Sequence, residues 1–465
     1  MKKYDYIIVG GGPTGLTLAH LLSKYNKTVA IIEKEDHIGG CHSVKRVNGL
    51  FSEHGPRIYL GNYIMFSQLL KDMGHSFTDL FGVYKFGKSD IFSEVFKKLS
   101  IRELLIFSFA FLTLNDSYKN MSLQDFLDKY NFSPSAQDFM DRIGRLTDGG
   151  GADKYTLFSF IQIMNQNLLY NIYQPKNPND VGLFKIWQDA LIKNKVDIYL
   201  NHPINKLIVE DSQIKLVITD KESFSCDKII FAMPPYSINE FIKKMGIPNA
   251  FGNNFDKWSE DTNYITYIPV AFHWRKKLDL KRIWGYPQTS WGVGSIVMSD
   301  YMNLNDDRSK TLISAIVTKS TKSDLLNKTP DEVPDKDEFT KEVFRQLNSV
   351  YENLPIPDYI IMSQNYHDGE KWIPEHTAFM TTKHGYLDFK SSYITNLYNC
   401  GVQNGKSSYS FTSLESSVVN AISLIHELIP ESKKEWKIKN AITLRSVLLI
   451  ITILILVIIF ILNRR

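Results

Sequence analysis

The first forty positions of the chain have the most regular pattern of apolar and polar residues. Residues 4–9 form a short β-branched run, and residues 16–22 carry apolar side chains at helical spacing. A glycine-rich turn at residues 10–15 joins them, and a second apolar run follows at residues 28–32. The pattern predicts a strand, a turn, a helix and a second strand, which together begin a Rossmann-type α/β domain.

The glycine-rich turn has the spacing of a dinucleotide site. Gly10, Gly12 and Gly15 match G-x-G-x-x-G, in which the glycines turn the chain, admit a pyrophosphate and let the helix pack on the strand. Glu33 ends the second strand about 20 residues later, where a carboxylate accepts ribose hydroxyls. An unrelated glycine turn is the less favoured interpretation. The predicted nucleotide contacts are Gly10, Gly12, Pro13, Thr14, Gly15 and Glu33.

Apolar runs later in the chain predict a second region. Residues 104–112 are apolar on every side but too short to cross a bilayer, so we expect a buried helix. A patch that dips into a membrane is the alternative. Strand patterns at residues 196–233 and 393–401 return to the first region, and residues 267–274 predict a long strand of the second.

The most apolar run lies near the C-terminus. Residues 447–462 are Val, Leu, Ile and Phe apart from Thr452. Sixteen helical residues span about 24 Å, and counting from Ala441 adds two turns if Arg445 snorkels to the interface. We predict a single-pass tail anchor. More basic residues precede the run than follow it, which favours a cytoplasmic head.

Charge and cysteine content narrow the function classes. The net charge is +4, but residues 431–465 hold +5, so the rest is near neutral and unlike a nucleic-acid surface. Three distant cysteines, at 41, 226 and 400, fit a reduced compartment. Metal-ligand spacing, a G-x-S-x-G elbow and a Walker loop do not appear in the sequence. We therefore expect no bound metal, and we expect the reaction to depend on an organic cofactor.

The residues after Glu33 identify that cofactor. The segment from Glu33 to Gly40, with its paired glycine, resembles FAD-binding proteins of the flavin amine oxidase clan, which includes amine oxidases, protoporphyrinogen oxidases and phytoene desaturases. The clan usually continues Gly-Gly-Arg, whereas this chain has Cys41 at the third position. The resemblance implies FAD, held noncovalently because no cysteine occupies the clan's covalent position. The contacts it adds are Lys34, Gly39, Gly40, Cys41 and His42.

Later segments resemble the same clan. Glu53-His54-Gly55-Pro56-Arg57 is similar to a protoporphyrinogen oxidase segment beside the flavin ring, and the strand at residues 226–233 ends in the clan's Ala-x-Pro-Pro. Residues 400–403 and the helix start at residue 413 resemble the second FAD signature, with Gln403 in place of the usual acid. The implied FAD contacts are Gly55, Pro56, Arg57, Pro203, Ile204, Gly401, Ser413 and Leu414.

Two residues are catalytic candidates. Arg57 is expected to orient an anionic or carbonyl group of the substrate, with a structural ion pair as the alternative. Amine oxidases place a lysine before the long strand, where this chain has Ile268-Pro269, so amine oxidation loses support. His273 is a candidate base in its place, although a strand histidine is more often packed in the core. The residues from Trp284 to Pro287 are candidates for a pocket wall.

The resulting hypothesis is a membrane-anchored FAD-dependent oxidoreductase that takes hydride from a small organic substrate, apolar in one interpretation, and is reoxidised by dioxygen. The alternatives are a non-redox flavoprotein such as a sugar-nucleotide mutase, and a catalytically silent FAD-binding membrane protein. The fold class is α/β, a Rossmann-type domain interleaved with an α+β substrate domain and followed by a transmembrane helix. The expected parts are an FAD-binding domain at residues 1–84, 173–260 and 390–430, a substrate domain at 85–172 and 261–389, a basic linker at 431–446 and an anchor at 447–462.

Overall fold

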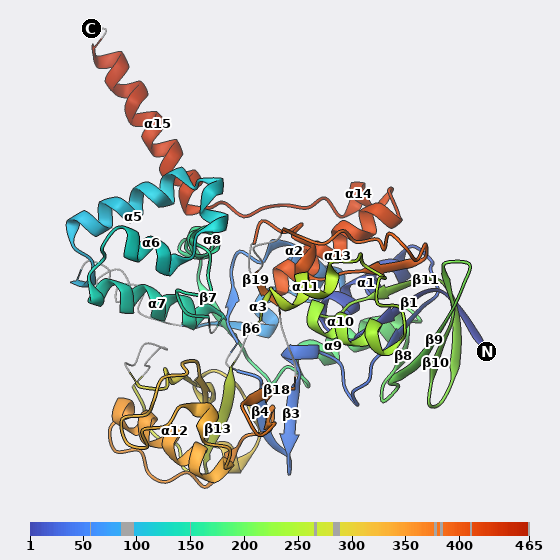
Figure 1. Ribbon diagram of the computed structural model, residues 1–465, viewed down its shortest axis with the longest axis horizontal. Helices are drawn as coiled ribbons and strands as arrows, with labels where there is room; N and C mark the ends of the chain where they lie inside the picture. Colours follow the sequence, from blue (N-terminus) through green and yellow to red (C-terminus); the bar gives the residue numbers. More distant parts are fainter. Residues whose placement is uncertain are drawn as a thin grey trace.

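A seven-stranded sheet occupies the right-hand part of the computed structural model in Figure 1. The structure describes residues 1–55, 57–84, 97–148, 150–264, 267–281, 289–375, 379–381, 385–409 and 412–463. The strand order is β8-β2-β1-β11-β10-β9, and β20 pairs with β11 beside this path. Five strands are parallel, and β10 and β9 add an antiparallel edge. The strands are β1 (Lys2–Val9), β2 (Val29–Ile32), β8 (Asp197–Tyr199), β9 (Ile204–Glu210), β10 (Gln213–Thr219), β11 (Ser223–Phe231) and β20 (Leu397–Asn399).

Helices cover both faces of this sheet. Alternate residues of a strand point to opposite faces, so Ile8 and Ile31 belong to one apolar cluster and Ile7 and Ala30 to another. The buried strands are therefore apolar throughout, as is typical of parallel sheets. The first cluster includes α1 (Pro13–Lys24), α2 (Ile64–Asp72), α9 (Leu183–Lys193) and α13 (Leu414–Leu428), and the second includes α10 (Pro235–Lys244) and α11 (Phe255–Glu260). The predicted strand, turn, helix and strand at residues 4–32 are confirmed.

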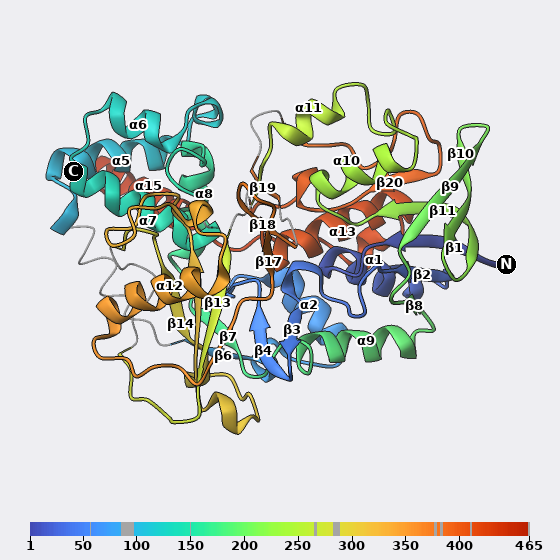
Figure 2. The same ribbon diagram turned by 60° about the horizontal axis from the view of Figure 1, so that its bottom comes forward.

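A second sheet lies beside the first, at the lower left of Figure 2, where β13 and β14 are labelled. Its order is β14-β15-β13-β16, and α12 (Lys336–Tyr351) covers one face through a cluster around Phe272 and Phe339. The predicted long strand is confirmed as β13. The strands are β13 (Ile268–Trp274), β14 (Gly294–Val297), β15 (Thr311–Val317) and β16 (Tyr359–Ile361).

The other face of the second sheet meets a hairpin from the first region. Strands β3 (Val44–Val47) and β4 (Leu50–Glu53) are joined by an Asn-Gly turn, with Asn48 at φ 52° and Gly49 at φ 81°. Val44 and Phe51 of this hairpin pack with Leu312 of β15. The hairpin therefore connects the first region to the second sheet.

Four helices form a third group, α5 (Ile101–Thr113), α6 (Leu123–Lys129), α7 (Pro134–Asp148) and α8 (Leu157–Asn167). The expected buried helix at residues 104–112 is present as α5, but its burial was wrongly predicted. Leu105 is 67% exposed and Phe109 is 69% exposed, whereas Ala110 and Phe111 are buried. The pattern could not reveal this, because a helix that is apolar on every side has no polar face to mark solvent.

Short elements connect these groups. A three-stranded sheet, β5-β7-β6, lies between the first sheet and the helical group. The remaining strands and short helices are β5 (Tyr59–Leu60), β6 (Phe81–Val83), β7 (Ile172–Pro175), β12 (Asn263–Tyr264), β17 (Asn365–His367), β18 (Trp372–Pro374), β19 (Phe379–Thr381), α3 (Phe77–Leu80) and α14 (Ser432–Glu435).

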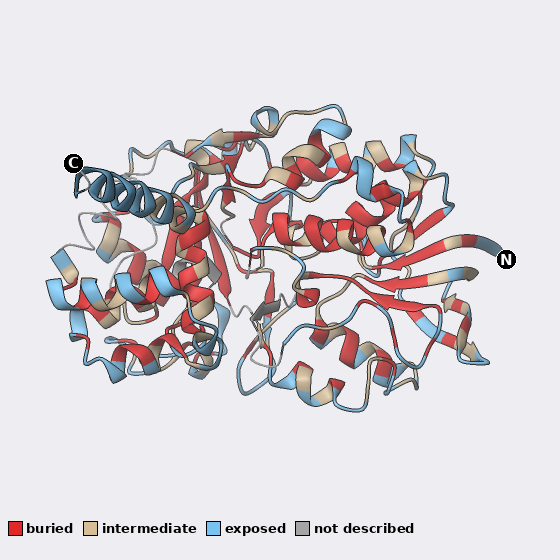
Figure 3. Ribbon diagram, turned by 90° about the horizontal axis from the view of Figure 1, so that it is seen from above, coloured by how far each residue is buried: buried red, intermediate tan, exposed pale blue. Residues whose placement is uncertain are grey.

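The last helix, α15 (Leu444–Asn463), projects from the helical group, and from Leu449 onward it is exposed all round (Figure 3). Leu444 and Leu448 in its first turns are partly buried against the head. Its 20 residues span about 30 Å at about 1.5 Å each, which matches the thickness of a hydrocarbon core. By length and composition it is able to cross a membrane. The helix begins at Leu444 and not at Ala441, and Arg445 donates from Nε to the carbonyl oxygen of Leu112 at 2.8 Å, which joins α15 to α5.

Candidate functional site

The glycine turn packs too tightly to carry side chains at two of its three positions. Gly10 has φ +111°, and a Cβ there would lie 2.7 Å from the carbonyl oxygen of Ala232. A Cβ at Gly15 would collide with the carbonyl oxygen of Gly10, which explains the close packing of α1 on β1. A Cβ at Gly12 would have its nearest neighbour 3.9 Å away, so open space lies beside the start of α1. The helix begins there with no side-chain cap, and its first N–H groups face that space.

Glu33 is held beside this turn. Its Oε2 accepts the N–H of Gly11 at 2.7 Å, and its Oε1 accepts the N–H of Glu35 at 3.0 Å. The carbonyl oxygen of Glu33 accepts the N–H of His202 at 2.9 Å, which brings Pro203 and Ile204 to the same end of the sheet. Lys34 differs, because its exposed ammonium pairs with Glu35 at 3.3 Å.

The paired glycine closes onto the first turn. Gly39 donates its N–H to the carbonyl oxygen of Gly11 at 2.8 Å, and a Cβ at Gly40 would lie 3.2 Å from the Cα of Gly12. Gly39 has φ +120°, and a side chain there would meet the ring of Phe184 at 2.7 Å. The two glycine motifs, 24 residues or more apart along the chain, therefore form one cradle.

Arg57 completes the cradle on the side of the second sheet. Its Nη2 donates to the carbonyl oxygen of Cys41, in the segment where the clan usually has its own arginine. Burial, assisted by Arg57, holds the pKa of His42 well below its usual value, so the ring is neutral. Burial also raises the pKa of the Cys41 thiol.

Two polar atoms in this cradle have no hydrogen-bond partner among the described residues, the Nε of Arg57 and the Nδ1 of His42. A buried polar atom left unpaired costs about 1–3 kcal/mol. A polar ligand in the cradle would remove that cost. The open space at Gly12 and these two atoms together fit the diphosphate and ring system of FAD.

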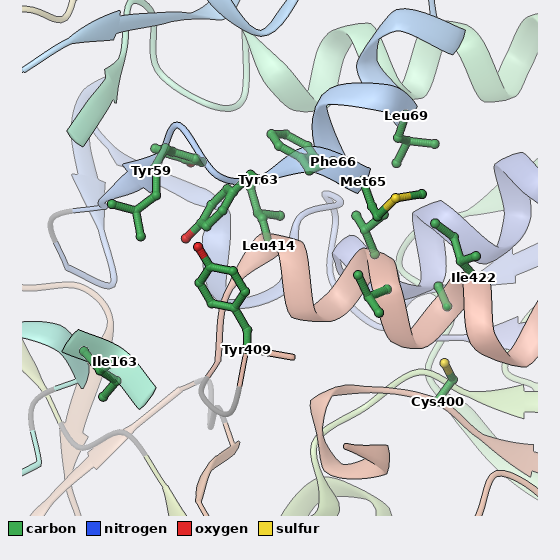
Figure 4. Packing of buried hydrophobic residues seen from close by; sticks show 14 of the residues in the cluster. Tyr59, Tyr63, Met65, Phe66, Leu69, Ile163, Cys400, Tyr409, Leu414 and Ile422 are labelled. Carbon is green, nitrogen blue, oxygen red and sulfur yellow. The ribbon is translucent and has the colours of Figure 1, made fainter. Parts of the chain in front are cut away.

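The second signature lies against the same end of the sheet. Cys400 donates its N–H to the carbonyl oxygen of Phe231 at 2.9 Å, and the Nε2 of Gln403 donates to the carbonyl oxygen of Met233 at 3.3 Å. Gly401 follows directly. Ser413 caps α13 by accepting the N–H of Ser416 at 3.0 Å. Leu414 is buried at the first turn of α13, below Tyr63, whose hydroxyl points toward that of Tyr409 (Figure 4).

A carboxyl group that the sequence did not single out lies beside Arg57. Glu53 ends β4, and burial raises its pKa to about 7, although Arg57 and Ser314 act in the opposite direction. The Oγ of Ser314 on β15 donates to the Oε1 of Glu53 at 3.4 Å. Burial and the nearby Glu53 raise the pKa of the Tyr301 hydroxyl, so this phenol stays protonated.

Tyr301, which Glu53 influences, packs against an aromatic residue next to β6. The ring of Tyr84 meets that of Tyr301 edge-on at 5.4 Å. Gln174 is fully buried on β7, and its amide atoms have no hydrogen-bond partner among the described residues. Gln174 is paired with Gly82, two residues before Tyr84, so Gln174 and Tyr84 share a face of this small sheet. This face therefore carries a buried amide without a hydrogen-bond partner among the described residues.

The segment after Glu53 touches the second sheet directly. A Cβ at Gly55 would lie 3.1 Å from the Cγ2 of Ile316 and 3.2 Å from the ring of Tyr267. The ring of His54 lies 5.7 Å from that of Tyr267. Tyr267 and Ile316 therefore form an apolar wall opposite the cradle. Pro56 lies outside the described residues, as do the candidate wall residues from Trp284 to Pro287.

His273 lies in the core, which agrees with the interpretation of a packed strand histidine. It lies on β13 two residues beyond Ala271, which is the residue paired with Ser314, and so about 7 Å farther along the strand. Its Nδ1 is hydrogen-bonded to the Oγ of Ser309 at 2.8 Å. Burial lowers its pKa to about 4. His273 is thus a neutral core residue away from the cradle, because the same face of β13 packs on the hairpin.

The structure brings most predicted contacts to one end of the first sheet and leaves out Lys34 and His273. It adds residues for which the sequence pattern carries little signal. Glu53 begins the motif that ends in Arg57, but its burial depends on Ser314, which is 261 residues away. Within the described residues, no group of three or more His, Cys, Asp or Glu side chains could hold a metal ion.

Known proteins resemble this chain in sequence. The family model described as flavin containing amine oxidoreductase matches residues 13–404. A UDP-galactopyranose mutase from Mycoplasma genitalium is 28% identical over 257 residues, which is 53% of this chain and 53% of that protein. The chain therefore matches about half the length of this curated relative.

Solved structures resemble it in fold. An oxidoreductase from Methanosarcina mazei has a TM-score of 0.64 at 14% identity and covers 91% of this chain and 100% of its own. A putrescine oxidase bound to putrescine has a TM-score of 0.64 at 14% identity, with 92% and 99% covered. At this identity the likeness is one of fold.

Proposed function

Because the chain belongs to the family of flavin containing amine oxidoreductases, we propose that it is an FAD-dependent oxidoreductase held at a membrane by α15. The matches confirm the resemblance to the flavin amine oxidase clan, and its cofactor is FAD, held noncovalently. The proposed reaction removes a hydride and a proton from a small organic substrate and reduces dioxygen to hydrogen peroxide. The substrate is protoporphyrinogen-like or amine-like. The observation that carries this proposal is the buried Glu53 beside Arg57, which adjoins the cradle.

The proposed division of labour follows the two sheets. Residues 1–84, 173–260 and 390–430 form the FAD-binding part, and residues 85–172 and 261–389 form the substrate part. Bound flavin supplies a hydride acceptor. The N-terminal amides of α1 and the backbone at Gly12 and Gly40 would bind the diphosphate, and Glu33 would accept the ribose hydroxyls. Arg57 would fix the segment around Cys41 against the ring system.

Glu53 is suited to move a proton in this site. A carboxyl group with a pKa of about 7 accepts and releases protons at neutral pH, which a carboxyl in water does not. Ser314 on β15 holds it by a hydrogen bond from the substrate side. Tyr267 and Ile316 add buried apolar side chains beside Gly55. The chain therefore positions the substrate, limits the access of water to the site and supplies one titratable carboxyl group.

Anaerobic mixing tests this proposal. The purified holoprotein is mixed with a polyamine, a porphyrinogen and a polyene in turn, and the flavin absorbance is followed. Bleaching by one class, reversed by dioxygen with release of peroxide, supports the proposal and names the substrate class. Silence with every class would leave FAD as a structural ligand.

A second candidate is a non-redox mutase acting on a sugar nucleotide, favoured by the match to the Mycoplasma genitalium protein. Such a substrate carries two phosphates and needs free cations. Several basic residues near the second sheet are already paired: Lys45 with Glu375 at 2.6 Å, Arg46 with Asp180 at 2.6 Å and Arg145 with Asp141 at 2.7 Å. This pairing weighs against the mutase. Conversion of a UDP-galactopyranose substrate only after chemical reduction of the flavin would favour it.

The membrane anchor is a proposal with its own test. Support comes from the exposed apolar surface and length of α15, and from the basic segment that precedes it. We expect the full chain to stay with membranes after alkaline carbonate extraction. We expect the head to face the cytoplasm, so added protease should digest it in inverted but not in intact vesicles.

A further inference from the structure

The outward side of α5 carries a row of exposed apolar residues, with Arg102, Ser108 and Thr113 exposed beside it. Ile101, Leu105, Phe109 and Leu112 recur at intervals of four, four and three residues, which places them on one side of the helix. They are 79%, 67%, 69% and 37% exposed. The opposite side is fixed to the head, because Ala110 and Phe111 are buried. Soluble surfaces rarely expose such a contiguous row, so this face needs an occupant. We name these four residues the α5 face.

The base of α15 is attached next to the α5 face. The backbone N–H of Arg445 donates to the Oδ1 of Asn165 on α8 at 2.8 Å, and its Nε donates to the carbonyl oxygen of Leu112 at 2.8 Å. The hydroxyl of Tyr170 donates to the carbonyl oxygen of Ile442 at 2.9 Å. Ile442 is itself 65% exposed and extends the apolar surface toward α15. These bonds set the direction in which α15 leaves the head.

We propose that the α5 face lies in the interfacial layer of the same lipid bilayer that α15 crosses. This inference rests on the proposed anchor. In Figure 1, α5 forms the outer edge of the head on the side from which α15 projects, so a bilayer that receives α15 reaches α5 as well. A helix with one apolar face lies in the membrane plane with that face among the acyl chains. The head therefore contacts the bilayer at two places, α15 and the α5 face, and is not attached through α15 alone.

Site-specific fluorophores in the full-length holoprotein test this arrangement. Single cysteines are introduced as Leu105→Cys, Phe109→Cys and Ile453→Cys and labelled with an environment-sensitive dye. Ile356→Cys is the matched control, because Ile356 is 86% exposed and follows α12, away from α5. The unsubstituted chain, labelled in parallel, gives the background from its three native cysteines. Each protein is reconstituted into phosphatidylcholine vesicles with and without nitroxide-labelled lipid.

We expect lipid nitroxides to quench the labels at 105 and 109 severalfold more than the label at 356, and to a degree that approaches quenching at 453. Quenching at 453 with labels at 105 and 109 behaving like 356 would overturn the α5 contact and leave the anchor intact. A label at 453 that is not quenched would reject the anchor, and the α5 contact with it. Oxidation of unlabelled Leu105→Cys to a disulfide-linked dimer would assign the face to a second copy of the chain and also overturn the proposal.

Discussion

Ser314 donates a hydrogen bond to Glu53 across the boundary between the two sheets, with 3.4 Å between Oγ and Oε1. Ser314 belongs to the strand β15, and Glu53 ends the hairpin that leads to Arg57. The carboxyl group is buried, and burial raises its pKa to about 7 although Arg57 acts in the opposite direction. The proton transfer proposed for this site thus depends on a contact between a strand of the second sheet and the hairpin that extends from the first region.

Replacing Glu53 tests this titration. The ordinary pKa of this carboxyl is 4.5 and its pKa in the folded protein is about 7, so folding favours the protonated form. This contribution is complete below about pH 4.5 and is lost as pH rises through 7. We expect wild-type stability to fall over that window by on the order of 3 kcal/mol relative to Glu53→Gln. Urea unfolding at several pH values measures the difference, and parallel pH profiles of the two proteins would contradict it.

Removing the positive charge of Arg57 gives a second test, because it shifts the pKa of Glu53 and leaves the carboxyl group in place. Arg57 lowers the pKa of Glu53, so Arg57→Met is expected to move it further above 7. The pH limb of the turnover profile that reports Glu53 should move to higher pH, whereas in Glu53→Gln it should disappear. Steady-state rates across pH 5 to 9 check both variants, within the range that titrates such a group. An unchanged limb in Arg57→Met would show that another group carries it.

The first glycine motif yields a matched pair of substitutions. A Cβ at Gly15 collides with the carbonyl oxygen of Gly10, whereas at Gly12 the nearest atom is 3.9 Å away. Gly12→Ala should therefore fold normally but bind FAD at least about tenfold more weakly, a loss of about 1.4 kcal/mol. Gly15→Ala should lower Tm of the apoprotein itself. Flavin titration and thermal unfolding of each apoprotein separate the two effects, and equal FAD affinity in Gly12→Ala and wild type would contradict the placement of the diphosphate.

These glycines show why the cofactor cradle could be predicted from sequence. Gly15 packs against Gly10, five residues earlier, whereas Gly10 meets Ala232 and Gly12 lies near Gly40. The cradle could still be predicted because the spacing of the three glycines is itself the signature of a dinucleotide turn. Glu53 and Gln174 differ, because their burial is produced by β15 and by the small sheet, which come from distant segments. Lys34 lies within the predicted segment, but its side chain is exposed and pairs with Glu35. The sequence motif fixes the path of the backbone there and does not determine where this side chain points.

Glu415 carries a prediction about stability alone. Its two carboxylate oxygens accept the N–H groups of Met65 and Phe66 at 2.9 Å each, and so cap the start of α2 from α13. Glu415→Ala leaves two buried N–H groups without partners, at about 1–3 kcal/mol each. Glu415→Gln keeps one acceptor and should lose about half as much. Urea unfolding of the two variants gives the comparison, and equal losses would show that the carboxylate acts by charge and not as a cap.

Arg445 couples the anchor to the head, and its removal should separate the two membrane contacts. In Arg445→Ala the bond to the carbonyl oxygen of Leu112 is lost, while the backbone N–H of residue 445 can still donate to Asn165. We expect α15 to remain inserted, because its apolar surface is unchanged, but the head to tilt more freely. Lipid quenching at position 105 should then fall toward the value at 356, while quenching at 453 is retained.

Arg445→Lys, which keeps a donor of similar reach, is the control and should restore part of the quenching at 105. Full quenching at 105 in Arg445→Ala would show that lipid contact on the α5 face, rather than the attachment of α15, holds the head in place.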